Sequence, residues 1–198
     1  SQVPLVVGEV NSNHIQLALQ QSFGLGKIFT NPNCSVMGLV LALKPIFDRF
    51  GLEDVHAVTM QAVSGAGYPG VASLDILDNV IPYIQGEEEK IVTEPLKILG
   101  AFSGGEVVPA RFSLSAQCHR VPVSDGHLIA VRVRLAEPGR AGDLVQAWEL
   151  FQGEPQRLQL PTAPACPVHY LADIRAPQPR LHRHLDKGMG VAVGRLKQ

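Results

Sequence analysis

Apolar residues recur at helical spacing in one long stretch of the chain. Between positions 36 and 50 they lie three or four residues apart, and Gly51, a residue type common at helix ends, follows the last of them. The pattern predicts an apolar helix with a kink at Pro45, because proline interrupts helical hydrogen bonding. The apolar positions are Val36, Leu39, Val40, Leu43, Ile46, Phe47 and Phe50.

An alternation of period two, typical of half-buried strands, runs from residue 127 to residue 135. It places His127 and Ile129 on the side that faces the core, whereas Arg132 and Arg134 point away. Shorter segments rich in β-branched residues predict further strands. These segments are residues 3–10, 27–30, 55–63 and 189–193.

The remaining helices are predicted with some alternatives open. Asn11 or Asn13 caps a helix that extends to Gln21. Residues 87–99 have helical composition, and Pro95 either kinks this helix or begins a second one. Helices interleaved with strands predict an α+β domain in which a helix layer covers one side of the sheet. Short helices are also predicted at residues 74–80 and 143–151.

Length and charge limit the class of protein. A chain of 198 residues and 21.3 kDa is expected to form one domain, residues 1–198. Its 17 Lys and Arg residues balance 18 Asp and Glu residues, which disfavours nucleic-acid binding. The longest apolar run, residues 36–43, is much shorter than the ~20 residues that cross a bilayer, and no secretory leader opens the chain. We therefore expect a soluble cytoplasmic protein with no nucleic-acid or membrane partner.

The two ends of the sequence are unusual. Residue 1 is Ser rather than Met, and both ends lie close to apolar segments, whereas natural termini are usually polar and frayed. The sequence is therefore expected to be a piece of a larger protein.

One of the three cysteines has a context that favours chemistry. The turn at residues 31–33 delivers Cys34 to the N-terminus of the predicted apolar helix, where unpaired N–H groups and the helix dipole stabilise a thiolate. Cys34 is therefore a candidate nucleophile; the alternative is a buried cysteine that packs as a small apolar residue. Cys118 and Cys166 lack this context and are expected to be structural. No CxxC or Cys/His spacing occurs, so neither a disulfide framework nor a metal site is predicted.

A nucleophilic thiol needs a proton carrier, and His127 is the best placed of the seven histidines. It follows the turn at residues 124–126 and is in phase with the core-facing side of its strand, so its imidazole is expected to point inward at the strand end. It is a candidate general acid/base for a neighbouring thiol; the alternative is a core histidine held by a backbone carbonyl. His182 and His184 are expected to lie in a solvated basic loop.

The segment Gly65-Ala66-Gly67-Tyr68-Pro69-Gly70 matches the GxGxxG pattern of dinucleotide-binding proteins. However, Pro69 and the turn-rich residues after it do not open a helix at the third glycine, and no repeated βαβ pattern surrounds the motif. We therefore interpret the segment as a flexible loop that lines a site.

Seven segments, in order along nearly the whole chain, resemble aspartate-β-semialdehyde dehydrogenases of the subgroup typical of archaea and fungi. Each segment alone is weak, but their combination is highly specific. The segments are NPNCS (31–35), MQAVSGAGYPG (60–70), SLDILDNVIPYIQGEEEKI (73–91), EPLKILG (94–100), CHRVPVSDGH (118–127), APQPRL (176–181) and GMGVAVGRL (188–196).

The resemblance implies a fold like the C-terminal domain of glyceraldehyde-3-phosphate dehydrogenase: an α+β domain with a mixed β-sheet, helices on one face and a homodimer interface on the other. Residues 1–198 would then be the catalytic and dimerisation domain. In the family, an NADP-binding Rossmann domain precedes the cysteine motif and a closing helix follows the last strand. Both are expected to be absent from this chain, so the isolated chain is expected to be inactive.

The resemblance also implies roles for single residues and a reaction. The implied reaction is the NADP-dependent reductive dephosphorylation of L-4-aspartyl phosphate to L-aspartate 4-semialdehyde, a step toward lysine, threonine and methionine. The implied roles are nucleophile for Cys34, general acid/base for His127, substrate binding for Gln61, Glu87 and Arg120, phosphate binding for Asn33 and Lys90, and NADP contact for Ser64 and Gly65.

The sequence departs from the family pattern at four places, which bear on specificity and turnover. They are Val36-Met37 after the cysteine, His119 before Arg120, Leu128-Ile129 after the histidine, and Lys187-Gly188. Three alternatives stay open: a noncatalytic dimerisation module, a thioester reductase domain like that of malonyl-CoA reductase, and a stand-alone cysteine hydrolase that uses Cys34 and His127.

Overall fold

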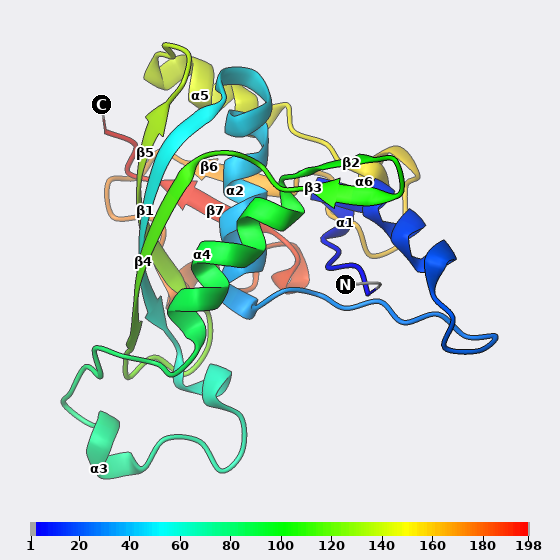
Figure 1. Cartoon of the computed structure of the whole chain (residues 1–198). Helices are drawn as coiled ribbons and strands as arrows, with labels where there is room; N and C mark the ends of the chain where they lie inside the picture. Colours follow the sequence, from blue (N-terminus) through cyan, green and yellow to red (C-terminus); the bar gives the residue numbers. More distant parts are fainter. Residues whose placement is uncertain (1–2, 198) are drawn as a thin grey trace.

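The centre of the fold is a three-stranded mixed sheet, seen in a computed structural model that describes residues 3–197 (Figure 1). Residues 1, 2 and 198 of the predicted domain lie outside the described part. The middle strand is β1 (Leu52–Gln61), which pairs in parallel with β4 (Ser113–Arg120) and antiparallel with β5 (Leu128–Leu135). Gln61 is paired with Arg120, so the last residues of β1 and β4 lie together at one end of the sheet.

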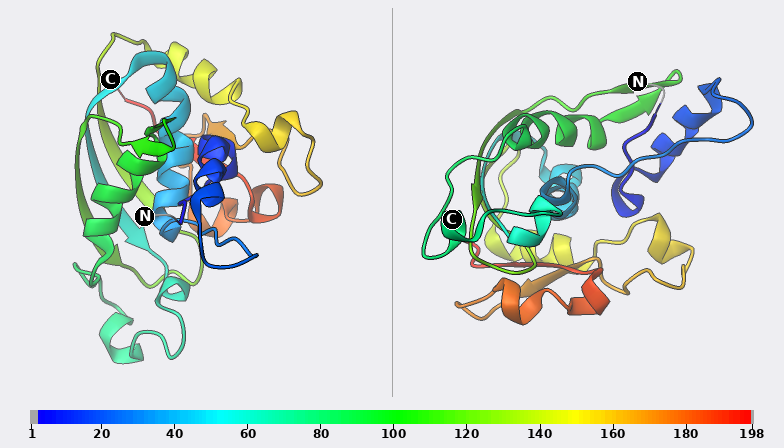
Figure 2. Two further views of the ribbon diagram at one scale, coloured as in Figure 1. Left: turned by 45° about the vertical axis from the view of Figure 1, so that its right-hand side comes forward. Right: turned by 90° about the horizontal axis from the view of Figure 1, so that it is seen from below.

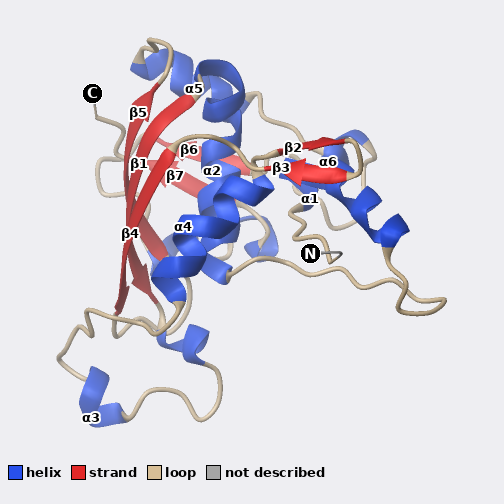
Figure 3. Cartoon of the chain, viewed as in Figure 1, coloured by secondary structure: helices blue, strands red, loops and turns tan. Residues whose placement is uncertain are grey.

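Two long helices cover one face of this sheet. α2 (Cys34–Phe50) and α4 (Glu87–Ile98) lie side by side on it, while no long helix of the described chain lies on the opposite face (Figures 2 and 3). The core between helices and sheet includes Leu39, Val55 and Ile91, each at most 2% exposed. The predicted α+β fold, with a mixed sheet and helices on one face, is confirmed.

Both helices form where apolar or helical composition predicted them. α2 ends at Gly51, whose φ of 63° favours glycine, and it continues through Pro45 as one element. α4 likewise continues through Pro95, so the second helix that could begin at Pro95 does not form. The Thr93 hydroxyl instead donates to the carbonyl oxygen of Glu89 at 2.7 Å, inside the same helix.

Alternate residues of β1 face the two sides of the sheet. Val55, Ala57, Thr59 and Gln61 lie under the helices and are each at most 1% exposed. The residues between them face the open side, which is more polar; there Nδ1 of His56 lies 2.7 Å from the Ser115 hydroxyl. The site residue Gln61 is therefore on the helix side of the sheet.

In β5, core-facing and exposed residues alternate as predicted, but one residue is more exposed than expected. It begins at Leu128, one residue after His127, and Arg132 and Arg134 are exposed as predicted. Val131, in phase with His127 and Ile129 and so expected to face the core, is 41% exposed, because β5 is an edge strand that α2 and α4 only partly cover. Ile129, Val133 and Leu135, on the same side, do pack against the core.

The N-terminal segment departs most from the prediction. A strand was expected at residues 3–10, but Gly8–Asn11 form a short helix, α1, and the strand-like contact is a single bridge between Leu5 and Thr30. The strand predicted at 27–30 is reduced to the same bridge. Within the described chain, these β-branched residues find no partner strand that would extend the pairing beyond this bridge.

The helix predicted to reach Gln21 is a 3-10 helix, η1 (Ser12–Gln20), and its N-cap Asn11 makes no side-chain cap bond. The Asn11 side chain instead accepts from the Val7 N–H at 2.8 Å and donates to the Leu5 carbonyl at 2.9 Å. This asparagine therefore satisfies the backbone before η1 and does not cap the helix after it.

Shorter elements complete the described chain. Trp148 of α5 (Ala141–Glu149) donates from Nε1 to the Ala42 carbonyl at 2.9 Å, which fastens α5 to α2. The predicted helix at 74–80 is shorter than expected, because only Ser73–Ile76 are helical. No helix within residues 3–197 has the length and apolar character needed to cross a membrane. The remaining elements are η2 (Val63–Ala66), α3 (Ser73–Ile76), β2 (Ala101–Ser103), β3 (Glu106–Val108), α5 (Ala141–Glu149), α6 (Glu154–Arg157), β6 (Val168–Leu171), α7 (Pro179–His182), η3 (Leu185–Gly188) and β7 (Val191–Gly194).

Candidate active site

The N-terminus of α2 presents an exposed cysteine. Asn33 is the N-cap, and its side-chain oxygen accepts hydrogen bonds from the N–H groups of Ser35 and Val36 at 2.9 and 3.4 Å. Its backbone N–H donates to Oε2 of Glu94 at 2.8 Å. Cys34 is the first residue of the helix and is exposed, so the predicted delivery of this thiol to a helix N-terminus is confirmed. The alternative of a buried small apolar residue is wrong.

His127 faces this cysteine from the start of β5. Its Nε2 lies 3.1 Å from Sγ of Cys34, and its Nδ1 accepts a hydrogen bond from the backbone N–H of Ala62 at 3.0 Å. The ring is thus held by a backbone donor and not by the carbonyl that the core-histidine alternative requires. Two residues 93 positions apart in the sequence form one pair, which we call the Cys34–His127 pair.

The surroundings of His127 favour its neutral form. Burial lowers the pKa of the imidazole, the positive charge of Arg120 lowers it further, and the negative charge of Glu87 opposes both. The net effect is a pKa below the ordinary histidine value. A neutral ring is therefore expected next to Cys34 across the physiological pH range.

Arg120, the last residue of β4, bonds Ala62, the same residue that bonds His127. It is 5% exposed, and Nη1 of its guanidinium donates to the Ala62 carbonyl at 2.8 Å. Its backbone N–H and carbonyl both pair with Ile81, at 2.9 and 3.0 Å, which fixes the strand end. A buried guanidinium so placed suits recognition of a carboxylate.

Glu87 is the centre of a second group of contacts. Its Oε2 accepts from Nδ2 of Asn33 at 2.7 Å and from Nε2 of Gln61 at 3.1 Å, and its Oε1 lies 3.3 Å from Nζ of Lys90. Burial alone would raise the pKa of this carboxyl, but the three donors together outweigh burial and lower it. Glu87 is therefore a charged carboxylate at the head of α4.

These contacts unite most of the predicted site. Asn33 precedes Cys34 and Gln61 precedes Ala62, so the Glu87 group and the Cys34–His127 pair are joined directly through the backbone. Gly65 packs against His127 and Arg120: a Cβ built on it would lie 3.0 Å from Nη1 of Arg120 and 3.1 Å from Cε1 of His127. Ser64 is exposed in η2, and its N–H donates to the Ser124 carbonyl at 3.1 Å.

The glycine motif behaves as the sequence interpretation expected. Gly65 lies in η2, Gly70 is in irregular backbone, and the next helix, α3, begins only at Ser73 and has 4 residues. No long helix opens at the third glycine within the described segment, as the sequence interpretation expected.

Two residues of the site had not been singled out from the sequence. Ala62 acts only through its backbone, so its side chain carries no signal. Glu94, which accepts from the Asn33 N–H, is seven residues after Glu87 in α4. That interval is two helical turns, so the shared face of the two carboxylates was a usable signal.

The other cysteines differ from each other. Cys118 is wholly buried on the helix side of β4, and burial raises the pKa of its thiol, which fits the structural role expected for it. Cys166 is exposed, so the expectation of a buried structural cysteine is wrong there; it precedes β6 in an irregular segment that offers no core position. Within residues 3–197, no group of three His, Cys, Asp or Glu side chains is arranged to hold a metal ion.

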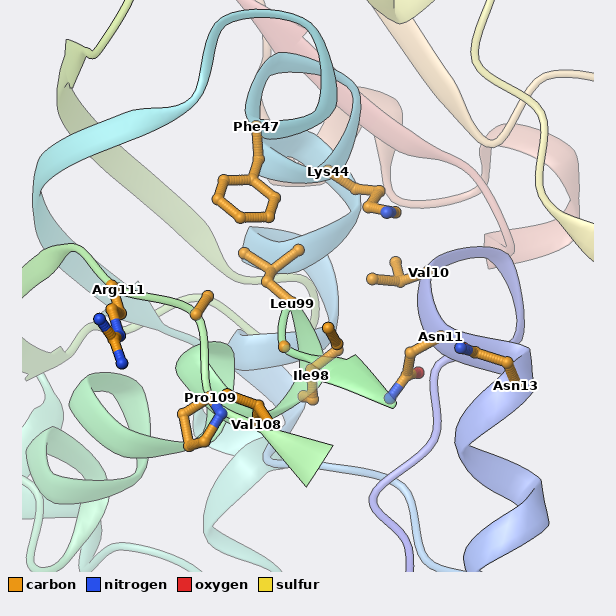
Figure 4. A pocket seen from close by; sticks show the side chains of 13 residues that line it. Val10, Asn11, Asn13, Lys44, Phe47, Ile98, Leu99, Val108, Pro109 and Arg111 are labelled. Carbon is orange, nitrogen blue, oxygen red and sulfur yellow. The ribbon is translucent and has the colours of Figure 1, made fainter. Parts of the chain in front are cut away.

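A hollow of about 520 Å³ lies elsewhere, between α1, the second half of α2 and the β2–β3 hairpin (Figure 4). None of the nine predicted site residues is among its lining residues. Asn11, one of its polar residues, is committed to Leu5, Val7 and His14, and Lys44 is paired with Asp48 at 2.7 Å. This hollow therefore does not compete with the cysteine site as a place for nucleophilic chemistry.

Comparison with known proteins gives a consistent result. Residues 43–198 match the family described as semialdehyde dehydrogenase, dimerisation domain. The aspartate-semialdehyde dehydrogenase of Methanothermobacter thermautotrophicus is 50% identical over 199 residues, which cover 99% of this chain and 57% of that protein. The enzyme of the same name from Trichophyton rubrum is 43% identical, with the same two coverages.

A solved structure gives the same match in three dimensions. The crystal structure of aspartate-semialdehyde dehydrogenase with NADP from Candida albicans has a TM-score of 0.87 and 40% sequence identity to this chain. The match covers 99% of this chain and 58% of that one. The chain thus spans somewhat more than half the length of these relatives.

Proposed function

This chain belongs to the semialdehyde dehydrogenase family by its dimerisation domain, and on that premise we propose that it carries the acyl-transfer site of an NADP-dependent, phosphorylating aldehyde dehydrogenase. The proposed reaction is reductive dephosphorylation of L-4-aspartyl phosphate to L-aspartate 4-semialdehyde. The observation that carries this proposal is the 3.1 Å approach of Nε2 of His127 to Sγ of Cys34 at the N-terminus of α2.

Cys34 is the proposed nucleophile. Its sulfur attacks the acyl carbon of the acyl phosphate, a C–S bond forms, and the bond between that carbon and the phosphate oxygen breaks. Phosphate leaves with the electron pair and takes its proton from solvent. The dipole of α2 stabilises negative charge on the sulfur and on the carbonyl oxygen, and His127 is the group in place to hold or move a proton there.

The charges around the pair suit an amino acid with a free carboxylate. The buried Arg120 guanidinium is placed for a bidentate grip on the α-carboxylate. Glu87, kept charged by Asn33, Gln61 and Lys90, suits the α-ammonium group, and Gln61 helps to orient it. Lys90, whose side chain is 50% exposed, and Asn33 are the proposed phosphate contacts.

The described residues are suited to contact the reacting end of NADP but not to hold its phosphates. The turn Val63–Ala66 carries the exposed Ser64, and Gly65 beside it contacts His127, but the glycine motif leads into no helix that could hold phosphates. When bound, the cofactor supplies the hydride that reduces the thioester. We propose that a part of the full-length protein outside these 198 residues binds its phosphates, so that this chain alone does not complete the cycle.

A group of exposed apolar side chains also supports a further, nucleotide-binding part of the full-length protein. The segment 15–29 exposes a series of large apolar side chains, which a packed nucleotide-binding part would cover. These side chains are Ile15, Leu19, Phe23, Leu25, Ile28 and Phe29, each at least 46% exposed.

The open face of the sheet is the proposed homodimer surface. It is formed by residues that alternate with the buried ones of β1, such as His56 and Met60, and by their neighbours on β4 and β5. The family description as a dimerisation domain supports this assignment. A second copy that pairs through this face would shield a sheet surface that no described helix covers.

The test is turnover of the full-length protein with L-aspartate semialdehyde, NADP and inorganic phosphate, followed by NADPH formation. We expect phosphate-dependent turnover that Cys34→Ser abolishes and that Cys166→Ser, the matched control at an exposed thiol, leaves unchanged. Turnover that depends on coenzyme A instead of phosphate would favour the malonyl-CoA-reductase-like alternative. Turnover that persists in Cys34→Ser would contradict the proposal, as would the absence of any turnover in the full-length protein.

A further inference from the structure

Two peptide groups at the end of β1 hold His127 and Arg120 in place. In the first, the Gln61 carbonyl accepts from the Val121 N–H at 3.0 Å, and the Ala62 N–H donates to Nδ1 of His127 at 3.0 Å. In the second, the Ala62 carbonyl accepts from Nη1 of Arg120 at 2.8 Å, and the Val63 N–H donates to the Val123 carbonyl at 2.8 Å.

Because each peptide group is bonded at both ends, neither can rotate without breaking a partner bond. Ala62 is also wholly buried, so water does not replace a broken bond there. The donor that faces Nδ1 of His127 is therefore a fixed feature of the strand end.

A backbone N–H can only donate, so Nδ1 must present its lone pair to it. The single proton of the neutral ring then sits on Nε2, the nitrogen that lies 3.1 Å from Sγ of Cys34. A doubly protonated ring would place Nδ1–H against the Ala62 N–H, which is repulsive. The positive charge of Arg120, whose guanidinium bonds the Ala62 carbonyl, also opposes a second proton, whereas the negative charge of Glu87 favours one.

Gly65 contributes space to the same arrangement. A Cβ at this position would lie 3.0 Å from Nη1 of Arg120, 3.1 Å from Cε1 of His127 and 3.5 Å from its Nε2. The first two distances are tighter than ordinary van der Waals contact, so a side chain at residue 65 would push the imidazole or the guanidinium from its place. The absence of a side chain lets both groups approach the end of β1.

We propose that Ala62 and Gly65 are positioning residues that hold His127 as the neutral Nε2–H tautomer, so that in the resting site His127 is a hydrogen-bond donor to Cys34. This inference rests on the proposed function and deepens it. In this state Nε2 has no lone pair with which to take a proton from the thiol. Proton transfer through His127 requires Nδ1 to gain a proton, and therefore to leave the Ala62 N–H first.

The direct test is nitrogen NMR of the 198-residue chain with ¹⁵N-labelled histidine, in which His127→Gln identifies the signals of His127. We expect one ring nitrogen to be protonated and the other unprotonated, with the unprotonated one assigned to Nδ1, from neutral pH down to below the ordinary histidine range of about 6.5. A proton on Nδ1, in either the other neutral tautomer or a doubly protonated ring, would overturn the proposal.

The role of Gly65 is tested with Gly65→Ala. We expect the His127 ring signals to move and the rate of Cys34 alkylation to fall by about tenfold or more, because the ring no longer lies against the sulfur. Gly38→Ala is the matched control: it makes the same change four residues after Cys34 in α2, where a Cβ meets nothing within 4 Å. Unchanged ring signals and an unchanged alkylation rate in Gly65→Ala would overturn the assignment of Gly65.

These results separate this proposal from the proposed function. If the His127 ring carries its proton on Nε2 but the full-length protein shows no turnover, the proposed reaction is contradicted and the positioning proposal stands. An Nδ1–H ring in a protein that does turn over would contradict only the positioning proposal.

Discussion

Nδ2 of Asn33 donates to Oε2 of Glu87 across 2.7 Å, and this bond ties the N-terminus of α2 to the N-terminus of α4. The same carboxylate oxygen accepts from Gln61 at the end of β1. One charged side chain thus connects two helices and the central strand at the place where Cys34 is presented. The geometry around the cysteine therefore involves this carboxylate as well as the helix cap.

Glu87→Gln tests this dependence. The amide has one acceptor oxygen where three donors converge, so we expect the free energy of unfolding to fall by about 1–3 kcal/mol. In the full-length protein KM for aspartate semialdehyde should rise, because the negative charge proposed to bind its ammonium group is gone. Denaturant unfolding and steady-state kinetics measure the two effects. Glu89→Gln, on the exposed side of α4, is the control. Equal behaviour of the two variants would refute the role of Glu87.

Asn33 has two separable functions, and two variants distinguish them. Asn33→Ala removes both the cap and the bond to Glu87, and we expect a loss of about 2–4 kcal/mol of stability. Asn33→Ser keeps a hydroxyl that can cap α2 but loses the donor to Glu87, so it should recover about 1 kcal/mol. Chemical denaturation measures both values. If Asn33→Ser is no more stable than Asn33→Ala, the cap contributes nothing.

Arg120→Lys tests the proposed carboxylate site. Lysine keeps the charge but lacks the planar fork, so kcat/KM for aspartate semialdehyde should fall by about 100-fold or more, mainly through KM. The exposed Arg180→Lys serves as the control and should leave the kinetics unchanged. An Arg120→Lys enzyme with unchanged KM would place the carboxylate of the substrate elsewhere.

Stability should fall on acidification in two separate windows. Burial lowers the pKa of His14, against the opposing effect of its bond to Gly100, and burial with Arg120 lowers that of His127. Both histidines bind protons more tightly when unfolded, so stability is complete above about pH 6.5 and declines below it. The lowered pKa of Glu87 adds a further loss below about pH 4.3, where the unfolded carboxyl takes up its proton first.

Denaturation curves across this pH range measure both declines. His14→Gln should make the decline in stability in the upper window shallower and leave the decline in the lower window unchanged. Glu87→Gln should remove part of the decline in the lower window. A stability that is constant between pH 7 and about 5 would contradict the account of the two histidines.

The sequence predicted α2, β1, α4 and β5 because the cause of each is local: apolar spacing along the element and a cap or glycine at its end. It failed for residues 3–10 and 27–30 because a strand requires a partner, and their partner is limited to one bridge in the described chain. The same β-branched composition therefore yields a short helix and irregular backbone there.

Candidate residues with reactive side chains were predicted from sequence motifs, whereas the contacts between these residues were not. Cys34 and His127 each had a local argument, but their contact depends on the register of β5 against β1 and on the placement of α2. Ala62 was missed because its contribution is made by two backbone groups, which every residue type possesses. Such a role becomes visible only when both partners are placed in space.

The most direct test of the account is the alkylation rate of each cysteine in the folded chain, resolved by peptide mass spectrometry, with and without His127→Gln. We predict that Cys34 reacts fastest and slows by at least about tenfold in His127→Gln. Cys166 should react as an ordinary exposed thiol in both proteins, and the buried Cys118 should react only on unfolding. If Cys34 reacts no faster than Cys166, or is indifferent to His127, the Cys34–His127 pair is not a nucleophilic site.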